Sequence, residues 1–164
     1  MPGVLAVITG ADLKEAGLGD LPCEVPMKNR DGSDRAEAPH PALAVDTVRH
    51  VGDPVAFVVA ESYAQAKDAA EAIAVDYDTL PSTTDLATAD KGAPVWPAAP
   101  NNVVFDWEVG DKDLAAKLFK QAAHVVRLNV VNNRIVVASM EARAAVAAFD
   151  KESGRFTLHT NTQG

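Results

Sequence analysis

Residues 53–77, DPVAFVVAESYAQAKDAAEAIAVDY, carry the clearest structural signals of the chain. Residues 55–60 form a continuous apolar run, which is typical of a strand buried on both faces. Ser62 and Gln65 have the spacing of a helix-capping box, and apolar residues then recur at helical spacing. In residues 73–77, larger apolar side chains alternate with small or acidic ones, as they do in a half-buried strand. The stretch therefore predicts a strand, a helix and a second strand.

The residues before this stretch predict a shorter strand and helix, followed by a long irregular segment. Val4–Thr9 is an apolar run between two glycines and indicates another buried strand. Residues 11–16 have room for one or two helical turns before two further glycines. Residues 21–41 are rich in Pro, Asp, Asn, Gly and Ser and predict a surface excursion. Such a loop either covers a neighbouring domain or subunit or moves freely.

The second half of the chain begins with residues 81–100, whose Pro, Ala, Thr and Asp predict a linker. A helix is expected over residues 112–123, capped by Asp111 and apolar along one face. Residues 143–150 and 155–161 flank a four-residue turn that ends in glycine, which predicts a hairpin. Further strands are expected at residues 102–109, 124–129 and 135–138. Because a hairpin alone buries little surface, this third of the chain looks like part of a larger sheet.

Composition limits the possible function classes. The 164 residues are 48% hydrophobic with a net charge of −8, so one domain or two small ones can form a core. This acidic balance argues against nucleic acid or an anionic membrane as a partner. No apolar run is long enough to span a bilayer, and the first residues do not resemble a secretory signal. A cytoplasmic location is therefore expected.

The residues themselves reveal no catalytic centre. Tyr63 and Lys67 have the spacing of a dehydrogenase pair, but the glycines that would cradle a pyrophosphate are missing from the preceding turn. The four histidines are scattered singly, and Cys23 has no second cysteine with which to hold a metal or form a disulfide. From the residues alone, the expectation is an α+β protein without a visible active site.

Four stretches, taken in order, resemble the large subunits of the xanthine dehydrogenase/aldehyde oxidase family of molybdenum hydroxylases, which includes carbon monoxide dehydrogenase. They are residues 2–13 (PGVLAVITGADL), residues 41–44 with 48–56 (PALA and VRHVGDPVA), residues 64–77 (AQAKDAAEAIAVDY), and Asn133-Arg134 with Met140-Glu141 and Arg143. Ala142 departs from the family pattern, which has a proline here, and a fixed backbone φ is lost with it.

This resemblance implies an α+β fold in two parts. Residues 1–89 correspond to an α/β hammerhead domain without its first segment, residues 90–100 to a linker, and residues 101–164 to the truncated start of a molybdopterin-binding α+β domain. In relatives, a Thr-Gln pair at the end of this hairpin places the glutamine beside the molybdenum. Gln163 is the matching residue, and its amide can donate a hydrogen bond without adding charge. Gly164 would allow the backbone to approach the cofactor closely. No catalytic residue and no direct metal ligand is expected in this stretch.

The resemblance also implies a complete enzyme that hydroxylates an aldehyde, an N-heterocycle or carbon monoxide with oxygen from water. Its molybdopterin is expected in the cytosine dinucleotide form. Its 2Fe-2S clusters and FAD are expected on an iron–sulfur small subunit and an FAD-binding medium subunit, within a dimer of heterotrimers. The 164 residues alone are expected to be inactive. A non-catalytic hammerhead-type binding or interaction module is the main alternative, and it predicts a chain that ends at Gly164 and folds as a monomer. An unrelated α+β domain is a third possibility, and the substrate stays open.

Overall fold

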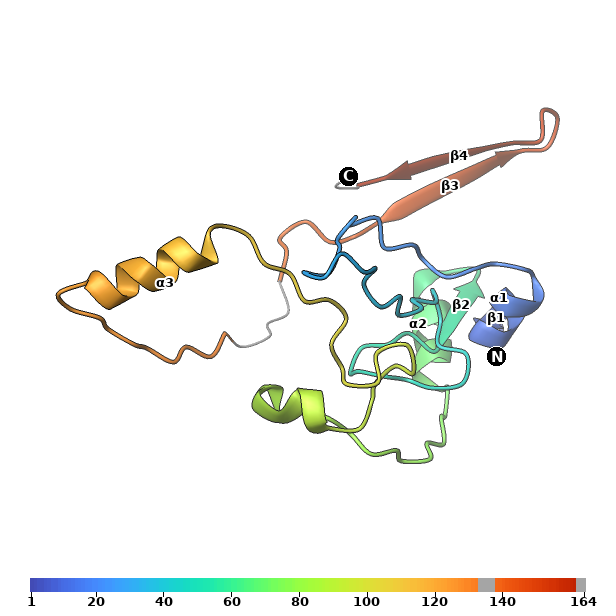
Figure 1. Ribbon diagram of the computed structural model, residues 1–164. Helices are drawn as coiled ribbons and strands as arrows, with labels where there is room; N and C mark the ends of the chain where they lie inside the picture. Colours follow the sequence, from blue (N-terminus) through green and yellow to red (C-terminus); the bar gives the residue numbers. More distant parts are fainter. Residues whose placement is uncertain (133–137, 162–164) are drawn as a thin grey trace. The chain divides into compact units, whose positions relative to one another are not determined.

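The computed structural model describes residues 1–132 and 138–161 of the chain (Figure 1). The chain divides into two compact units, Met1–Asp111 and Lys112–Gly164. Helices and strands occur in both units, in agreement with the predicted mixture of the two. None of the helices in the described part of the chain has the length and apolar character needed to cross a membrane.

The sheet of the first unit consists of β1 (Val4–Thr9) and β2 (Ala56–Ala60), paired antiparallel with an irregularity near the start of β1. Both strands were expected, and both form. The expectations of a buried strand for β1 and of burial on both faces for β2 are wrong, because half-buried and exposed residues alternate along β1 and Phe57 of β2 is exposed. In a described sheet of only two strands, neither strand has neighbours on both sides.

Helix α1 (Gly10–Glu15) follows β1 directly, as predicted. Its start is a complete capping box that the sequence analysis did not identify. The Asp12 carboxylate accepts from the Thr9 backbone N–H at 2.7 Å, and Thr9 Oγ1 accepts from the Asp12 N–H at 3.4 Å. Two of the donors that every helix start leaves without partners are satisfied in this way.

Helix α2 (Tyr63–Glu71) packs against β2 and β1. Ser62 caps it as predicted, and Ser62 Oγ accepts from the Gln65 N–H at 3.4 Å. The Gln65 side chain does not close the predicted box, since its Oε1 accepts from the Ser62 hydroxyl at 2.8 Å. The interpretation of these two residues as a helix start was therefore correct, but only one half of the box forms.

Three predicted strands are absent from the described residues. Residues 73–77, 102–109 and 124–129 have no strand assignment, and of residues 135–138 only the last is described. Alternation of side chains determines which of them share a face, but a strand also needs a neighbour for its backbone N–H and C=O groups. The sequence pattern shows which side chains share a face, but it does not show whether a neighbouring strand is present.

The irregular segments of the first unit contain some local structure. Residues 21–41 run over the surface as predicted and contain one isolated bridge, between Lys28 and Asp34. Residues 81–100 contain a 3-10 helix, η1 (Leu86–Lys91). The buried hydrophobic residues among those described are few and small: Leu43, Ala69 and Ala99.

The second unit contains helix α3 (Lys112–Gln121) and a hairpin of β3 (Ala145–Asp150) and β4 (Arg155–Thr160). The helix begins directly after Asp111, and the hairpin pairs antiparallel, both as predicted. Gly154 lies in the hairpin turn at a φ of 67°, a conformation that glycine adopts at little cost.

Solvent exposure is high among the described residues. The accessible surface of the chain is 14622 Å². A compact monomer of this mass has about 7,800 Å², and two separate globules of the sizes of the two units would together expose only about 9,300 Å². Every described residue of the second unit is exposed. Much apolar surface is thus available for contact with further polypeptide.

Candidate functional site

The two predicted cofactor-contacting residues, Gln163 and Gly164, lie outside the described residues. The structure describes the hairpin that precedes them as far as Asn161. The geometry of this hairpin therefore determines where the chain stands just before the predicted contact.

Asn161 ties the open end of the hairpin together. Its Nδ2 donates to the Ala142 carbonyl at 3.1 Å, and its Oδ1 accepts from the Ala144 N–H at 3.2 Å. Thr160 Oγ1 adds a bond to the Ala144 carbonyl at 3.1 Å. These bonds place the end of β4 beside the Met140-Glu141 stretch that carries part of the family resemblance. Asn161 was not among the predicted site residues, although an amide side chain at a strand end was an available signal.

The register of the hairpin gives it two chemically different faces. One face carries Ala145, Ala147, Phe149, Phe156, Leu158 and Thr160, and the other carries Val146, Ala148, Asp150, Arg155, Thr157 and His159. The rings of Phe149 and Phe156 lie 4.5 Å apart between centroids. Both rings are exposed, so the apolar face has no cover among the described residues.

Asp150 organises the hairpin turn. Its carboxylate accepts from the Ser153 hydroxyl at 2.6 Å and from the Glu152 N–H at 2.9 Å. The Ser153 side chain, and after it the two backbone N–H groups, hold the pKa of Asp150 below its ordinary value. A charged carboxylate is therefore part of the folded turn.

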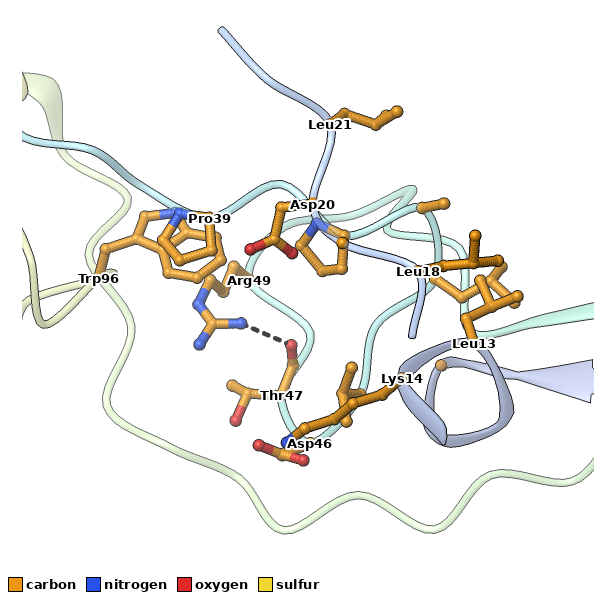
Figure 2. Close-up of a pocket in the computed structure, with 16 residues that line it drawn as sticks. Leu13, Lys14, Leu18, Asp20, Leu21, Pro39, Asp46, Thr47, Arg49 and Trp96 are labelled. Carbon is orange, nitrogen blue, oxygen red and sulfur yellow. Dashed lines mark hydrogen bonds between the residues drawn. The ribbon is translucent and has the colours of Figure 1, made fainter. Parts of the chain in front are cut away.

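The first unit contains an open pocket of about 590 Å³ (Figure 2). Its lining comes from α1, the segment that follows α1, several residues between 39 and 47, Arg49 and Trp96. Leu13 and Leu18 lie at one end of the opening and Trp96 with Pro39 at the other (Figure 2). The lining carries both signs of charge, because Lys14 and Arg49 are accompanied by Asp20 and Asp46.

Arg49 forms part of this wall and is already engaged by protein groups. Its guanidinium lies 3.5 Å from the centroid of a ring of Trp96. One terminal nitrogen donates to the Thr47 carbonyl at 2.9 Å (Figure 2), and Nε donates to the Val95 carbonyl at 3.2 Å. Two carbonyls and an aromatic face thus hold the guanidinium, and Arg49 acts as a structural connection between residues 47–49 and 95–96.

The VRHVGDP stretch forms a tight turn around Asp53. The Asp53 carboxylate accepts from the backbone N–H of Arg49 at 2.6 Å and from that of His50 at 3.3 Å. The His50 ring also contacts it, with Nε2 at 2.9 Å from Oδ1. Gly52 has a φ of 97°, which a residue with a side chain rarely adopts. This part of the family resemblance therefore has a structural role in the first unit.

Asn102 is a second connection that sequence reasoning missed. Its Nδ2 donates to the carbonyls of Ala89 at 2.8 Å and Ala93 at 2.9 Å, and its Oδ1 accepts from the Val95 N–H at 2.8 Å. Its φ of 56° is positive, which asparagine tolerates better than most residues. The residue ties together the segment that follows η1.

Other candidate groups do not assemble into a site. Tyr63 is 84% exposed, and Lys67 pairs with Glu71 one helical turn away at 3.8 Å. Within residues 1–132 and 138–161, no three His, Cys, Asp or Glu side chains lie close enough to hold a metal ion. Cys23 is exposed and is a free cysteine that forms no disulfide.

Two protein-family models match the chain. Residues 1–81 match the a/b hammerhead domain of aldehyde oxidase and xanthine dehydrogenase. Residues 95–164 match the molybdopterin cofactor-binding domain. The two matches follow each other in the order that the four resembling stretches predicted.

Individual relatives align along nearly the whole chain. The nicotine 6-hydroxylase large subunit of Paenarthrobacter nicotinovorans is 34% identical over 99% of this chain and 19% of its own length. The carbon monoxide dehydrogenase large chain of Afipia carboxidovorans is 32% identical over 96% of this chain and 20% of its own length. The aldehyde oxidoreductase of Megalodesulfovibrio gigas is 30% identical over the full chain and 18% of its own length.

The chain thus spans about a fifth of the length of these relatives. Both family matches and the relatives agree with the four stretches read from the sequence. The chain belongs to the aldehyde oxidase and xanthine dehydrogenase family of molybdenum enzymes, and it corresponds to the hammerhead and molybdopterin-binding regions of their large subunits.

Proposed function

We propose that the protein is the catalytic large subunit of a molybdenum hydroxylase, and that these residues supply its hammerhead domain and the beginning of its molybdopterin-binding domain. In this proposal residues 1–89 are the α/β hammerhead domain, residues 90–100 the linker, and residues 101–164 the start of the α+β cofactor-binding domain. The observation that carries the proposal is the succession of both family matches along the chain.

The exposed surface supports the same proposal. The apolar face of the β3–β4 hairpin includes Phe149, Phe156 and Leu158, which are 51%, 75% and 62% exposed. An uncovered apolar face of this kind is costly in water, at about 25 cal/mol for each Å². Cover from the remainder of a much longer subunit removes that cost, and the relatives are about five times longer than this chain.

The cofactor of this proposal is molybdopterin, in the cytosine dinucleotide form. Because the described residues of the second unit are all exposed, they do not by themselves enclose a group of this size, and no reaction step is assigned to them. The contacts are assigned to Gln163, whose amide donates a hydrogen bond near the metal, and to Gly164, which permits close approach of the backbone. The bound cofactor supplies the redox chemistry at the substrate carbon.

The names of the relatives support an assembly of several subunits, because they include a "large subunit", a "large chain" and a "subunit gamma" of a dehydrogenase complex. We place an iron–sulfur small subunit with 2Fe-2S clusters and an FAD-binding medium subunit beside this one, in a dimer of heterotrimers in the cytoplasm. Electrons would pass from the molybdenum through the clusters to the flavin.

The reaction class is hydroxylation of a carbon centre with oxygen from water. Relatives are named for nicotine, carbon monoxide, aldehydes and xanthine, so the substrate class is an aldehyde, an N-heterocycle or carbon monoxide. The substrate is to be identified by trial of these four.

The test is expression of the full-length subunit together with its partner subunits. We expect about one molybdenum per large subunit by elemental analysis, the fluorescence of an oxidised pterin after denaturation, and reduction of a dye acceptor with one of the four substrates. A full-length protein that binds neither molybdenum nor pterin contradicts the proposal and favours a non-catalytic binding module.

The site assignment has its own test in the loaded enzyme. Gln163→Ala is expected to lower turnover at least about tenfold, since one donor near a reacting centre contributes on the order of 10²–10³ in rate. Gln121→Ala, at the exposed end of α3, is the control and leaves turnover unchanged. Equal turnover of the two variants would remove Gln163 from the site.

A further inference from the structure

A loop in the hammerhead region, residues 29–36, forms hydrogen bonds with residues 104–108, which precede α3. The backbone N–H of Arg30 donates to the Asp106 carbonyl at 2.8 Å, and that of Ala36 donates to the Val104 carbonyl at 2.8 Å. The Asp106 N–H in turn donates to the Asn29 side-chain oxygen at 2.8 Å. Residues 29–36, which we name the clamp loop, thus bind residues 104–108 through the backbone even though neither segment is a regular strand.

Charged side chains strengthen this contact. Arg30 Nε donates to Asp106 Oδ2 at 3.0 Å, and a terminal nitrogen of Arg30 donates to Glu108 Oε2 at 2.9 Å. The hydrogen bond with Asp106, and then that with Glu108, raises the pKa of Arg30 above its ordinary value. One arginine therefore engages two carboxylates that lie 76 and 78 residues further along the chain.

The clamp loop has internal order that keeps it ready for this contact. Asn29 Nδ2 donates to the Asp34 carbonyl at 2.9 Å and to Ser33 Oγ at 3.0 Å. Asp31 accepts from the Ser33 N–H at 2.9 Å. Gly32 has a φ of 85° at the tip, which permits the tight reversal. Because these bonds lie within the loop, its shape does not depend on residues 104–108 alone.

The contact joins two regions that the family comparison separates. The clamp loop lies within residues 1–81 of the hammerhead match, and residues 104–108 lie within residues 95–164 of the cofactor-binding match. Structurally, both belong to the unit Met1–Asp111. The first residues of the cofactor-binding region are therefore attached to the unit Met1–Asp111, and the chain leaves that unit only after its contact with the clamp loop.

We propose that the clamp loop anchors the first residues of the molybdopterin-binding region to the unit Met1–Asp111, with Arg30 as its main positioning residue. The proposal rests on the proposed function, because it concerns the residues at which the cofactor-binding region begins. A single exposed ion pair contributes little to the stability of a contact. The clamp combines two carboxylates with three backbone-anchored hydrogen bonds, so the parts act together.

The test uses the full-length enzyme with its partner subunits and compares Arg30→Ala with Lys28→Ala. Lys28 pairs with Asp34 inside the same stretch and does not reach residues 104–108, so its variant is the matched control. Arg30→Ala is expected to speed amide hydrogen exchange in residues 104–108 about fivefold, because it removes the exposed ion pairs with Asp106 and Glu108. Lys28→Ala leaves this exchange unchanged. Equal exchange rates in the two variants overturn the clamp.

Two further measurements separate positioning from general stability. In a double-mutant cycle, amide hydrogen exchange in residues 104–108 is compared among Arg30→Ala, Asp106→Ala and the double variant. The double variant is expected to exchange at the rate of the more severe single variant, because both substitutions remove the same contact. Additive effects overturn the pairing. Arg30→Ala is also expected to release molybdenum faster than the wild type during gel filtration, whereas Lys28→Ala is not. A wild-type protein without molybdenum contradicts the proposed function, yet the exchange experiment still tests the clamp.

Discussion

The two units differ in the reach of their contacts. In Met1–Asp111, side-chain hydrogen bonds join residues up to 78 positions apart, and four residues are buried. In the described part of Lys112–Gly164, the Asn161 side chain reaches back 19 positions to Ala142, and every residue is exposed. Regular elements are nevertheless present in both.

This difference shows that secondary structure and burial have separate causes. Helix α3 and the β3–β4 hairpin form from local signals, namely apolar spacing, a turn glycine and a turn aspartate. Their apolar faces need partners from elsewhere, because such elements are marginal in water by themselves. The comparison predicts that substitutions in the first unit alter its stability strongly, and that substitutions in the second act mainly in the complete enzyme.

The largest effect is expected from Gly10→Val. A Cβ at Gly10 would lie 2.3 Å from the Ala44 carbonyl oxygen, which is backbone and cannot rotate away. We expect a loss of about 3 kcal/mol in the free energy of unfolding of the first unit. Urea unfolding followed by the fluorescence of Trp96 and Trp107 measures this unit, since both tryptophans belong to it.

Gly19→Ala is the control for Gly10→Val, because nothing lies within 4 Å of a Cβ there. Its effect is expected to stay within about 0.5 kcal/mol. Amide exchange in α3 should remain the same in both variants, since the second unit does not share this contact. An unfolding midpoint for Gly10→Val equal to that of Gly19→Ala would contradict the close packing of α1 on residues 43–44.

Asn102→Ala is expected to cost about 2 kcal/mol. It removes three hydrogen bonds and leaves a residue with a Cβ at a φ of 56°. Asn102→Gly removes the same bonds but accepts that φ without strain, so it should cost less by about 1 kcal/mol. Measured by the same fluorescence transition, equal losses for the two variants would show that the backbone conformation is not part of the effect.

Arg49→Ala is expected to cost about 1 kcal/mol, because it removes the guanidinium from the Trp96 ring and from two carbonyls. Arg49→Lys retains the charge but not the planar group, and should recover only part of the loss. The emission of Trp96 should also change in both variants. Full recovery by lysine would mean that charge alone, and not stacking, holds residues 95–96.

Elements with local causes were predictable from the sequence. The strands β1 and β2, the helices α1, α2 and α3, and the hairpin all follow from apolar spacing and from turn or cap residues within about ten positions. The family was also recognisable, since its four stretches lie in order along the chain, and the comparisons confirm it. Gln163 and Gly164 stay predictions, because they lie outside the described residues.

Features that join distant residues were not predictable. The pairing of Arg30 with Asp106 depends on a separation of 76 positions, which no local pattern encodes. Residues 73–77 show the reverse error, because their alternation suggested a strand for which the described structure offers no neighbour. Asn102 and Asn161 act through amide groups whose partners become visible only once the fold is known.

The smallest expected effect is the pH dependence of the β3–β4 turn, which comes from Asp150. The folded state holds the pKa of Asp150 below its ordinary value, so the contribution of Asp150 to stability is present above that value and is lost as pH falls through the folded pKa. Asp12 and Asp85 in the first unit are shifted in the same direction by Thr9 and Thr88. Acidification below about pH 4 should therefore weaken both units together.

Asp150→Asn separates the turn from the rest. The amide oxygen can still accept from the Glu152 N–H, but it carries no charge to lose, so exchange of the β3–β4 amides should become insensitive to pH between about 3 and 6 once the intrinsic exchange rate is divided out. The acid sensitivity of α1 in the same variant should persist, because the Thr9–Asp12 box is untouched. Loss of pH sensitivity in both units would mean that the hairpin and the first unit are coupled. Persistence in both would mean that another carboxylate governs the turn.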